Sequence, residues 1–131
     1  MANKKIVWVE DDEEVISAFQ PYLKTHKWEV FPAPSAKEGK ALAQKVKPDL
    51  IIMDIIMEGQ HGYAAIKDIK SEPVLTDVPI IVFSGITHRW GETTASRQDA
   101  LLSEADEFVD KSEGPDVLLG AVTKYLGAQV A

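Results

Sequence analysis

An uninterrupted run of four large apolar residues, 50–53, ends in an acidic residue, Asp54, near the middle of the chain. Pro48 precedes the run and a segment with two glycines follows it, so the run has the length and boundaries of a strand. Strands that are apolar on both faces are typical of the centre of a parallel sheet. Ligands of such sheets bind beyond the carboxyl ends of the strands, which makes Asp54 a candidate functional residue. An Asp after a strand can instead cap a helix, but residues 55–57 lead into glycine and not into a helical pattern.

The rest of the chain alternates between strand-like and helix-like patterns. Pro21 should bend or shorten the first helix, and Ser35 is a suitable N-cap for the second. Five strands that alternate with five helices predict an α/β fold with a parallel sheet built from right-handed crossovers. Short apolar runs predict strands at residues 6–9, 28–31, 49–54, 79–83 and 107–110. Apolar residues at helical spacing predict helices at about 13–25, 35–46, 63–69, 94–102 and 115–126.

Length, charge and composition limit the classes of function. The 131 residues correspond to one domain, 1–131, and the absence of cysteine excludes disulfides and thiolate metal sites. A net charge of -7 argues against non-specific binding of nucleic acid, which depends on Lys and Arg. No apolar run approaches the roughly 20 residues that a membrane span needs, and the N-terminus does not have the pattern of a signal peptide. We therefore expect a cytoplasmic location, protein or cation partners, and no membrane contact.

Polar side chains follow four of the five predicted strands. The acids 10–12 follow the first strand, Asp54 ends the third, Ser84 the fourth and Lys111 the fifth. Because the carboxyl ends of parallel strands meet at one edge, these side chains should lie close together. Neighbouring carboxylates suit a hard cation such as Mg²⁺, and a hydroxyl and an ammonium can hold phosphoryl oxygens. The set predicts a carboxylate that accepts a phosphoryl group with the help of a metal ion.

Several of these residues also have a simpler interpretation when each is taken alone. The acidic run fits a solvated helix start about equally well, and Lys111 alone fits a surface lysine. The three histidines lack the spacing of a zinc site. Trp8 and Trp28 fall within strand patterns and are expected in the core, whereas Trp90 fits a buried anchor or a binding hot spot equally well. Only the joint placement of the acids, the hydroxyl and the lysine favours phosphoryl chemistry.

With this arrangement the chain resembles the receiver domain of two-component response regulators. The resemblance covers essentially the whole chain and is carried by Val9-Glu10-Asp11-Asp12, Asp54, Ser84-Gly85 and Phe108-Val109-Asp110-Lys111. It implies a flavodoxin-like three-layer (βα)5 fold whose five-stranded parallel sheet has the order 2-1-3-4-5. It implies a phospho-acceptor signalling domain, not an enzyme, although such a domain assists its own phosphorylation and dephosphorylation.

The resemblance also implies partners. A sensor histidine kinase or a histidine phosphotransfer protein would donate the phosphoryl group from a phosphohistidine. A downstream protein would receive the signal, either as a partner of a stand-alone receiver or as an output domain trimmed from a larger regulator. The resemblance also allows a dimer that forms on phosphorylation, and it implies no direct nucleic-acid binding by this domain.

Three matched residues would handle the phosphoryl group itself. Asp54 matches the phosphoryl acceptor, Ser84 matches the hydroxyl that bonds to the phosphoryl group, and Lys111 matches the lysine that pairs with it. Phe108 matches the switch aromatic, which turns inward as the hydroxyl moves. The face formed by the fourth helix, the fifth strand and the fifth helix would then carry the signal.

The metal site follows from the same resemblance. Asp11 matches a direct ligand of Mg²⁺ or Mn²⁺, and Glu10 matches a ligand that acts through water. Asp54 would also bind the ion, and the backbone carbonyl of Ile56 would complete the protein ligands.

The chain departs from the family pattern in three places. Met57-Glu58 and His61-Gly62 stand where the family often has Met-Pro and Asp-Gly, and extra residues lie between Ser84 and Lys111, around His88-Arg89-Trp90. Lys111 is followed by Ser112 and not by proline, so we expect a trans bond or a strained exception there, because a cis non-proline bond costs about 3 kcal/mol.

Other functions compete with the receiver interpretation. A phosphatase with an aspartyl-phosphate intermediate would need a second acid where Ile56 stands. A flavin-binding module would need a small, polar phosphate loop where the acids 10–14 stand. A degenerate receiver that serves only as a docking module is disfavoured because every phosphorylation residue is present.

Two apolar residues predict how long the phosphoryl group would last. Ile56 and Ile86 would flank the path of an attacking water, so we expect slow loss of the phosphoryl group.

Overall fold

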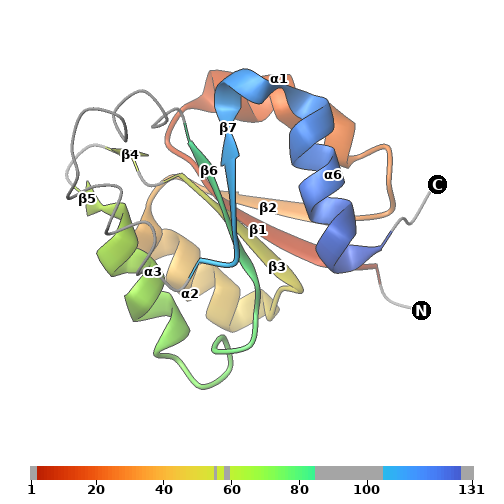
Figure 1. The fold of residues 1–131 in the computed structure, drawn as a ribbon. Helices are drawn as coiled ribbons and strands as arrows, with labels where there is room; N and C mark the ends of the chain where they lie inside the picture. The colour runs from red at the N-terminus through yellow and green to blue at the C-terminus, as the bar shows by residue number, and fades with distance from the viewer. Residues whose placement is uncertain (1–2, 55, 58–59, 85–104, 128–131) are drawn as a thin grey trace.

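The structure is a computed structural model, and it describes residues 3–54, 56–57, 60–84 and 105–127. Its main feature is a parallel sheet with the strand order β2-β1-β3-β6-β7 (Figure 1). Along the chain, β6 and β7 are the fourth and fifth strands of this sheet. The predicted order 2-1-3-4-5 is therefore confirmed. The five strands are β1 (Lys5–Val9), β2 (Glu29–Ala33), β3 (Leu50–Met53), β6 (Ile80–Ser84) and β7 (Glu107–Asp110).

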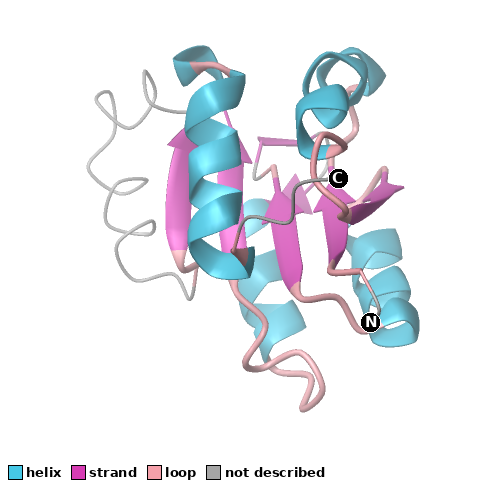
Figure 2. Ribbon diagram, turned by 90° about the vertical axis from the view of Figure 1, so that its right-hand side faces the viewer, coloured by secondary structure: helices cyan, strands magenta, loops and turns pink. Residues whose placement is uncertain are grey.

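Helices cover both faces of the sheet and produce three layers (Figures 1 and 2). On one face, α1 (Glu13–Leu23) and α6 (Pro115–Leu126) pack over a buried cluster that includes Trp8 and Phe83. On the other face, α2 (Ala36–Val46) and α3 (Gly62–Lys70) pack over a second cluster. The helix predicted at 94–102 lies outside the described residues.

The strands alternate between the two clusters with the period of two that a pleated backbone imposes. In β1, Ile6 and Trp8 enter the cluster under α1 and α6, whereas Val7 and Val9 enter the cluster under α2 and α3. The four residues of β3 divide between the clusters in the same way and are all buried. Burial on both faces is the reason that these strands are continuous apolar runs in the sequence. The prediction that Trp8 and Trp28 belong to the core is confirmed.

Helix ends follow the capping residues. The Ser35 hydroxyl accepts a hydrogen bond from the backbone N–H of Glu38 at 3.1 Å and begins α2, as predicted. Asp12 caps α1 in the same manner, since its carboxylate accepts from the N–H of Glu14 at 2.9 Å. The first helix continues through Pro21 and ends at Leu23, two residues before the predicted boundary.

A short hairpin follows Asp54. Strand β4 (Ile56–Met57) pairs in antiparallel fashion with β5 (Gln60–His61), and α3 begins directly afterwards. Strands of two residues are too short for periodicity to reveal them in a sequence.

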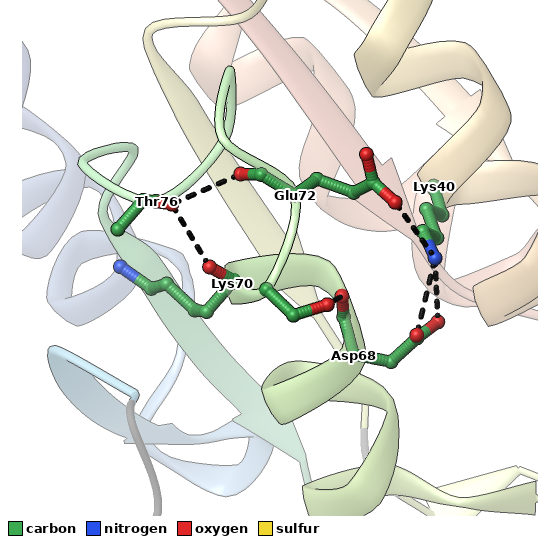
Figure 3. A network of polar contacts seen from close by, with 6 residues as sticks. Lys40, Asp68, Lys70, Glu72 and Thr76 are labelled. Carbon is green, nitrogen blue, oxygen red and sulfur yellow. Dashed lines mark hydrogen bonds and ion pairs between the residues drawn. The ribbon is translucent and has the colours of Figure 1, made fainter.

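Polar contacts join α2 to the carboxyl end of α3 (Figure 3). The Lys40 ammonium lies 3.1 Å from a carboxylate oxygen of Asp68 and 3.4 Å from one of Glu72. The Thr76 hydroxyl lies 3.0 Å from each of two backbone carbonyl oxygens, those of Lys70 and Glu72, and closes the turn after α3. The two helices on this face are therefore tied to each other as well as to the sheet.

Candidate functional site

The ends of β1 and β3 bring the candidate acids together. Val9 pairs with Met53 in the parallel register, and the backbone N–H of Asp54 donates to the Val9 carbonyl at 2.9 Å. Glu10 and Asp54 therefore leave the sheet at the same level. One carboxylate oxygen from each of Glu10, Asp11 and Asp54 lies within 4.8 Å of the others. The predicted acid cluster at this edge is present.

Two of these carboxylates are buried, and Lys111 supplies their counter-charge. The Lys111 ammonium donates a hydrogen bond to Oδ2 of Asp54 at 3.0 Å and lies 2.8 Å from Oε1 of Glu10. The contact with Glu10 is an ion pair without the direction of a good hydrogen bond. A buried charge is tolerated when it is paired, so Lys111 allows the carboxylates of Glu10 and Asp54 to be buried at this edge of the sheet.

The ionisation of the site follows from burial and from these pairs. Burial raises the pKa of Glu10 to about 7; the Lys111 ammonium opposes this rise, and the nearby charge of Asp54 adds to it. For Lys111, burial alone would lower the pKa, but the close contacts with the negatively charged Glu10 and Asp54 outweigh it and leave the pKa raised. The ammonium therefore remains charged at neutral pH.

Ser84 completes the surroundings of Asp54. It is the last residue of β6, the strand beside β3, and its side chain is buried. Its hydroxyl donates to Oδ1 of Asp54 at 2.6 Å. Each carboxylate oxygen of Asp54 therefore has a hydrogen-bond donor, one from Ser84 and one from Lys111.

The turn after β7 aims Lys111 at the acids. Lys111 begins a short 3-10 helix, η1 (Lys111–Glu113), that is closed by a capping box. In that box the Asp110 carboxylate accepts from the N–H of Ser112 at 2.9 Å, and Glu113 accepts from the N–H of Asp110 at 3.2 Å. No cis peptide bond occurs in the described ranges, so the predicted trans bond between Lys111 and Ser112 is confirmed.

The structure describes the other predicted site residues only in part. Phe108 lies in β7 and is 37% exposed. The backbone of Ile56 belongs to β4, where it pairs with His61, and its carbonyl as a metal ligand stays a prediction. The Ile56 side chain, Ile86 and the loop 88–90 lie outside the described residues. Sequence reasoning missed Asp12 as a cap, although an Asp directly before an acidic helical turn is the signal for one.

The chemistry of the acid cluster fits a hard divalent cation. Its side-chain ligands are all carboxylates, and oxygen ligands of this kind suit Mg²⁺. Asp11 is exposed, whereas Glu10 and Asp54 are buried, so the cluster is open to water on the side of Asp11. The cluster can therefore hold a metal ion beside Asp54.

Known proteins with similar sequences and folds point to one family. The sequence matches the response regulator receiver domain over residues 6–123. The protein PilH of Pseudomonas aeruginosa is 28% identical over 107 residues, which cover 79% of this chain and 88% of PilH. Several other curated relatives are longer, and the chain spans half of their length or less.

Solved structures share the fold. The chemotaxis protein CheY4 of Vibrio cholerae has a TM-score of 0.82 at 24% identity, over 95% of this chain and 100% of CheY4. The receiver domain of the sensor histidine kinase PA1611 from Pseudomonas aeruginosa has a TM-score of 0.81 at 20% identity. The match covers 97% of this chain and 100% of the PA1611 domain, which is described with a magnesium ion coordinated in its active site cleft.

None of the helices in the described part of the chain has the length and apolar composition to cross a membrane. The family match extends from β1 into α6 and contains every residue of the acid, hydroxyl and lysine cluster. The chain belongs to the response regulator receiver domain family.

Proposed function

We propose that Asp54 accepts a phosphoryl group from a phosphohistidine in a reaction that needs Mg²⁺ or Mn²⁺. The observation that carries this proposal is the set of groups around one buried carboxylate. Ser84 and Lys111 donate to its two oxygens, and two further acids lie within 4.8 Å. These are the groups that can hold three charged phosphoryl oxygens and a metal ion around an attacking carboxylate.

In the proposed step, an oxygen of Asp54 attacks the phosphorus atom of the donor. The new O–P bond forms as the N–P bond to the donor imidazole breaks, and the leaving nitrogen keeps the bonding electrons and takes a proton from solvent. Ser84 and Lys111 then donate to phosphoryl oxygens in place of the carboxylate oxygens that they bind in the free site. A bound ion would neutralise charge on the phosphoryl group, with Glu10, Asp11, Asp54 and the Ile56 carbonyl as its protein ligands. The magnesium described for the PA1611 receiver domain supports this assignment.

The chain would act as a signalling switch over a single domain, 1–131, and not as an enzyme with turnover. Phe108 lies on β7, next to the strand that ends at Ser84, and its ring is partly exposed. A move of the Ser84 hydroxyl toward a phosphoryl group would favour an inward position of this ring and shift the population of two packings. The face that changes would include β7, α6 and the predicted helix at 94–102.

The partners of this switch would be proteins. A sensor histidine kinase or a histidine phosphotransfer protein would supply the phosphoryl group in the cytoplasm. The signal would reach a downstream protein, an output domain outside this sequence, or a second copy in a phosphorylation-dependent dimer. Direct nucleic-acid binding by this domain is not expected at its net charge of -7.

The proposed function predicts that labelling of the wild-type protein depends on a divalent ion. Acetyl phosphate should add the mass of one phosphoryl group in the presence of Mg²⁺, measured by intact mass spectrometry, and should add almost none with a chelator. The physical reason is that three nearby carboxylates repel an incoming phosphate unless a cation neutralises them. Equal labelling with and without Mg²⁺ would contradict the metal site.

A second prediction concerns the lifetime of the phosphoryl group. Ile56 and Ile86 lie two residues after Asp54 and Ser84, where polar side chains could orient an attacking water. We expect slow hydrolysis in the wild type and faster hydrolysis in Ile56→Asn, where an increase of about ten-fold corresponds to about 1.4 kcal/mol of barrier. Phosphate release after removal of the donor measures the rate. Ile56→Val keeps an apolar side chain and is the control, and equal rates in Ile56→Asn and Ile56→Val would refute the prediction.

A further inference from the structure

Gly39 in α2 is packed against the ends of two strands. A Cβ atom at this position would lie closer to Cγ2 of Val9 than two carbon atoms can approach, and 3.7 Å from Cβ of Ala33. The glycine itself is buried. A Cβ atom at Gly120, the helical glycine of α6, would meet no atom within 4 Å beyond its chain neighbours and the backbone of its own helix. A larger residue at position 39 would therefore require Val9 or the helix to shift.

The residues under Gly39 are those from which the acid site emerges. Val9 and Ala33 are the last residues of β1 and β2, and they pair with each other in the sheet. The carbonyl of Val9 accepts the N–H of Asp54 at 2.9 Å, and the carbonyl of Ala33 accepts the N–H of Glu10 at 2.9 Å. A change in the position of Val9 would thus move the backbone that holds both buried acids.

A methyl group at residue 39 has two ways to find room, and both disturb this edge of the sheet. Val9 is fully buried and β-branched, so its side chain has few other rotamers available. The helix could instead move outward, but that would disturb the contacts of the next residue, Lys40, with Asp68 of α3 and with Glu72 in the turn after α3 (Figure 3). Close-packed interiors transmit such a displacement to the neighbouring backbone.

We propose that Gly39 is a positioning residue for the acid site, because its missing side chain sets the backbone at Val9 and so the relative placement of Glu10 and Asp54. The inference rests on the proposed function of the acids as metal ligands. Mg²⁺ demands near-ideal octahedral geometry with ligands at about 2.0–2.1 Å, so small shifts of these acids should weaken its binding.

The test compares Gly39→Ala with variants that separate geometry from stability. Calorimetric titration should show that Gly39→Ala binds Mg²⁺ about five-fold more weakly than the wild type, a coupling in the range measured for residues in contact. Gly120→Ala should bind Mg²⁺ as the wild type does. Val122→Ala, which creates a cavity in the cluster on the other face of the sheet, should lower the melting temperature without changing Mg²⁺ affinity.

Removal of the clash supplies the decisive comparison. The double variant Gly39→Ala/Val9→Ala should bind Mg²⁺ with the same Kd as Val9→Ala alone, because the smaller side chain makes room for the new methyl group. This comparison also applies when Gly39→Ala by itself does not fold. A double variant that binds more weakly than Val9→Ala, or a Gly39→Ala variant that binds like the wild type, would overturn the proposal.

Amide chemical shifts of the metal-free protein separate this inference from the function on which it rests. Gly39→Ala should shift the backbone amide signals of Glu10 and Asp54, and Gly120→Ala should leave them in place. If the wild type binds no Mg²⁺, the proposed metal site fails, and the amide comparison alone then decides for or against Gly39. Unchanged amide signals in Gly39→Ala would overturn the positioning role even where Mg²⁺ binds.

Discussion

Replacement of Asp54 by Asn is expected to abolish phosphoryl labelling of this protein. The amide of Asn has nearly the shape of the carboxylate but lacks the negative oxygen that attacks phosphorus. Its oxygen can still accept a hydrogen bond, so Ser84 or Lys111 retains a partner and the fold should remain intact. Acetyl phosphate with Mg²⁺ is the suitable donor because it needs no partner protein, and intact mass spectrometry measures the labelled fraction.

The control for this variant is an acid of the same type outside the site. Asp68 is exposed on α3, where it pairs with Lys40, and Asp68→Asn should be labelled to the same extent as the wild type. Labelling of Asp54→Asn to the same extent as the wild type would show that another residue is the acceptor and would refute the proposed function. Circular dichroism of both variants should match the wild type, so that loss of labelling reports chemistry and not unfolding.

Replacement of Lys111 by Met is expected to destabilise the metal-free protein by about 3 kcal/mol. Removal of one partner from a buried ion pair leaves an uncompensated charge, which typically costs about 3–5 kcal/mol. The Lys111 side chain is 22% exposed and the Glu10 side chain is fully buried, so we expect the lower end of this range. Urea unfolding in the presence of a chelator measures the change in the free energy of unfolding.

Mg²⁺ should restore much of the lost stability in Lys111→Met, because the proposed ion would bind the same carboxylates and only the folded state brings them together. Lys124→Met is a matched control. Lys124 pairs with Glu107 at 2.9 Å, almost the distance between Lys111 and Glu10, but its side chain is 65% exposed. Exposed pairs contribute about 0–1 kcal/mol, so this variant should lose little stability and gain nothing from Mg²⁺. Similar losses of unfolding free energy in Lys111→Met and Lys124→Met would show that burial does not strengthen the Lys111 ion pair.

Much of the fold could be predicted from the sequence because the central strands are buried on both faces. Runs such as 50–53 carry a signal that does not depend on the partner strand. The Ser35 cap and the α6 start at Pro115 are also local signals, which explains why those boundaries agree with the structure. The hairpin of β4 and β5 could not be predicted, because its backbone pairing leaves no periodic pattern in four residues.

The sequence by itself determined which chemical groups stand at the ends of the strands, because the order of apolar runs and polar residues along the chain sets that edge. Tertiary structure alone decided how those groups contact one another. Residues 54 and 111 are 57 positions apart, and the distance of 3.0 Å between their side chains depends on the register of three neighbouring strands and on the turn at η1. The burial that raises the pKa of Glu10 is likewise a property of the packed layers. So is the close approach at Gly39, since a glycine within a helical pattern does not reveal which strand it will face.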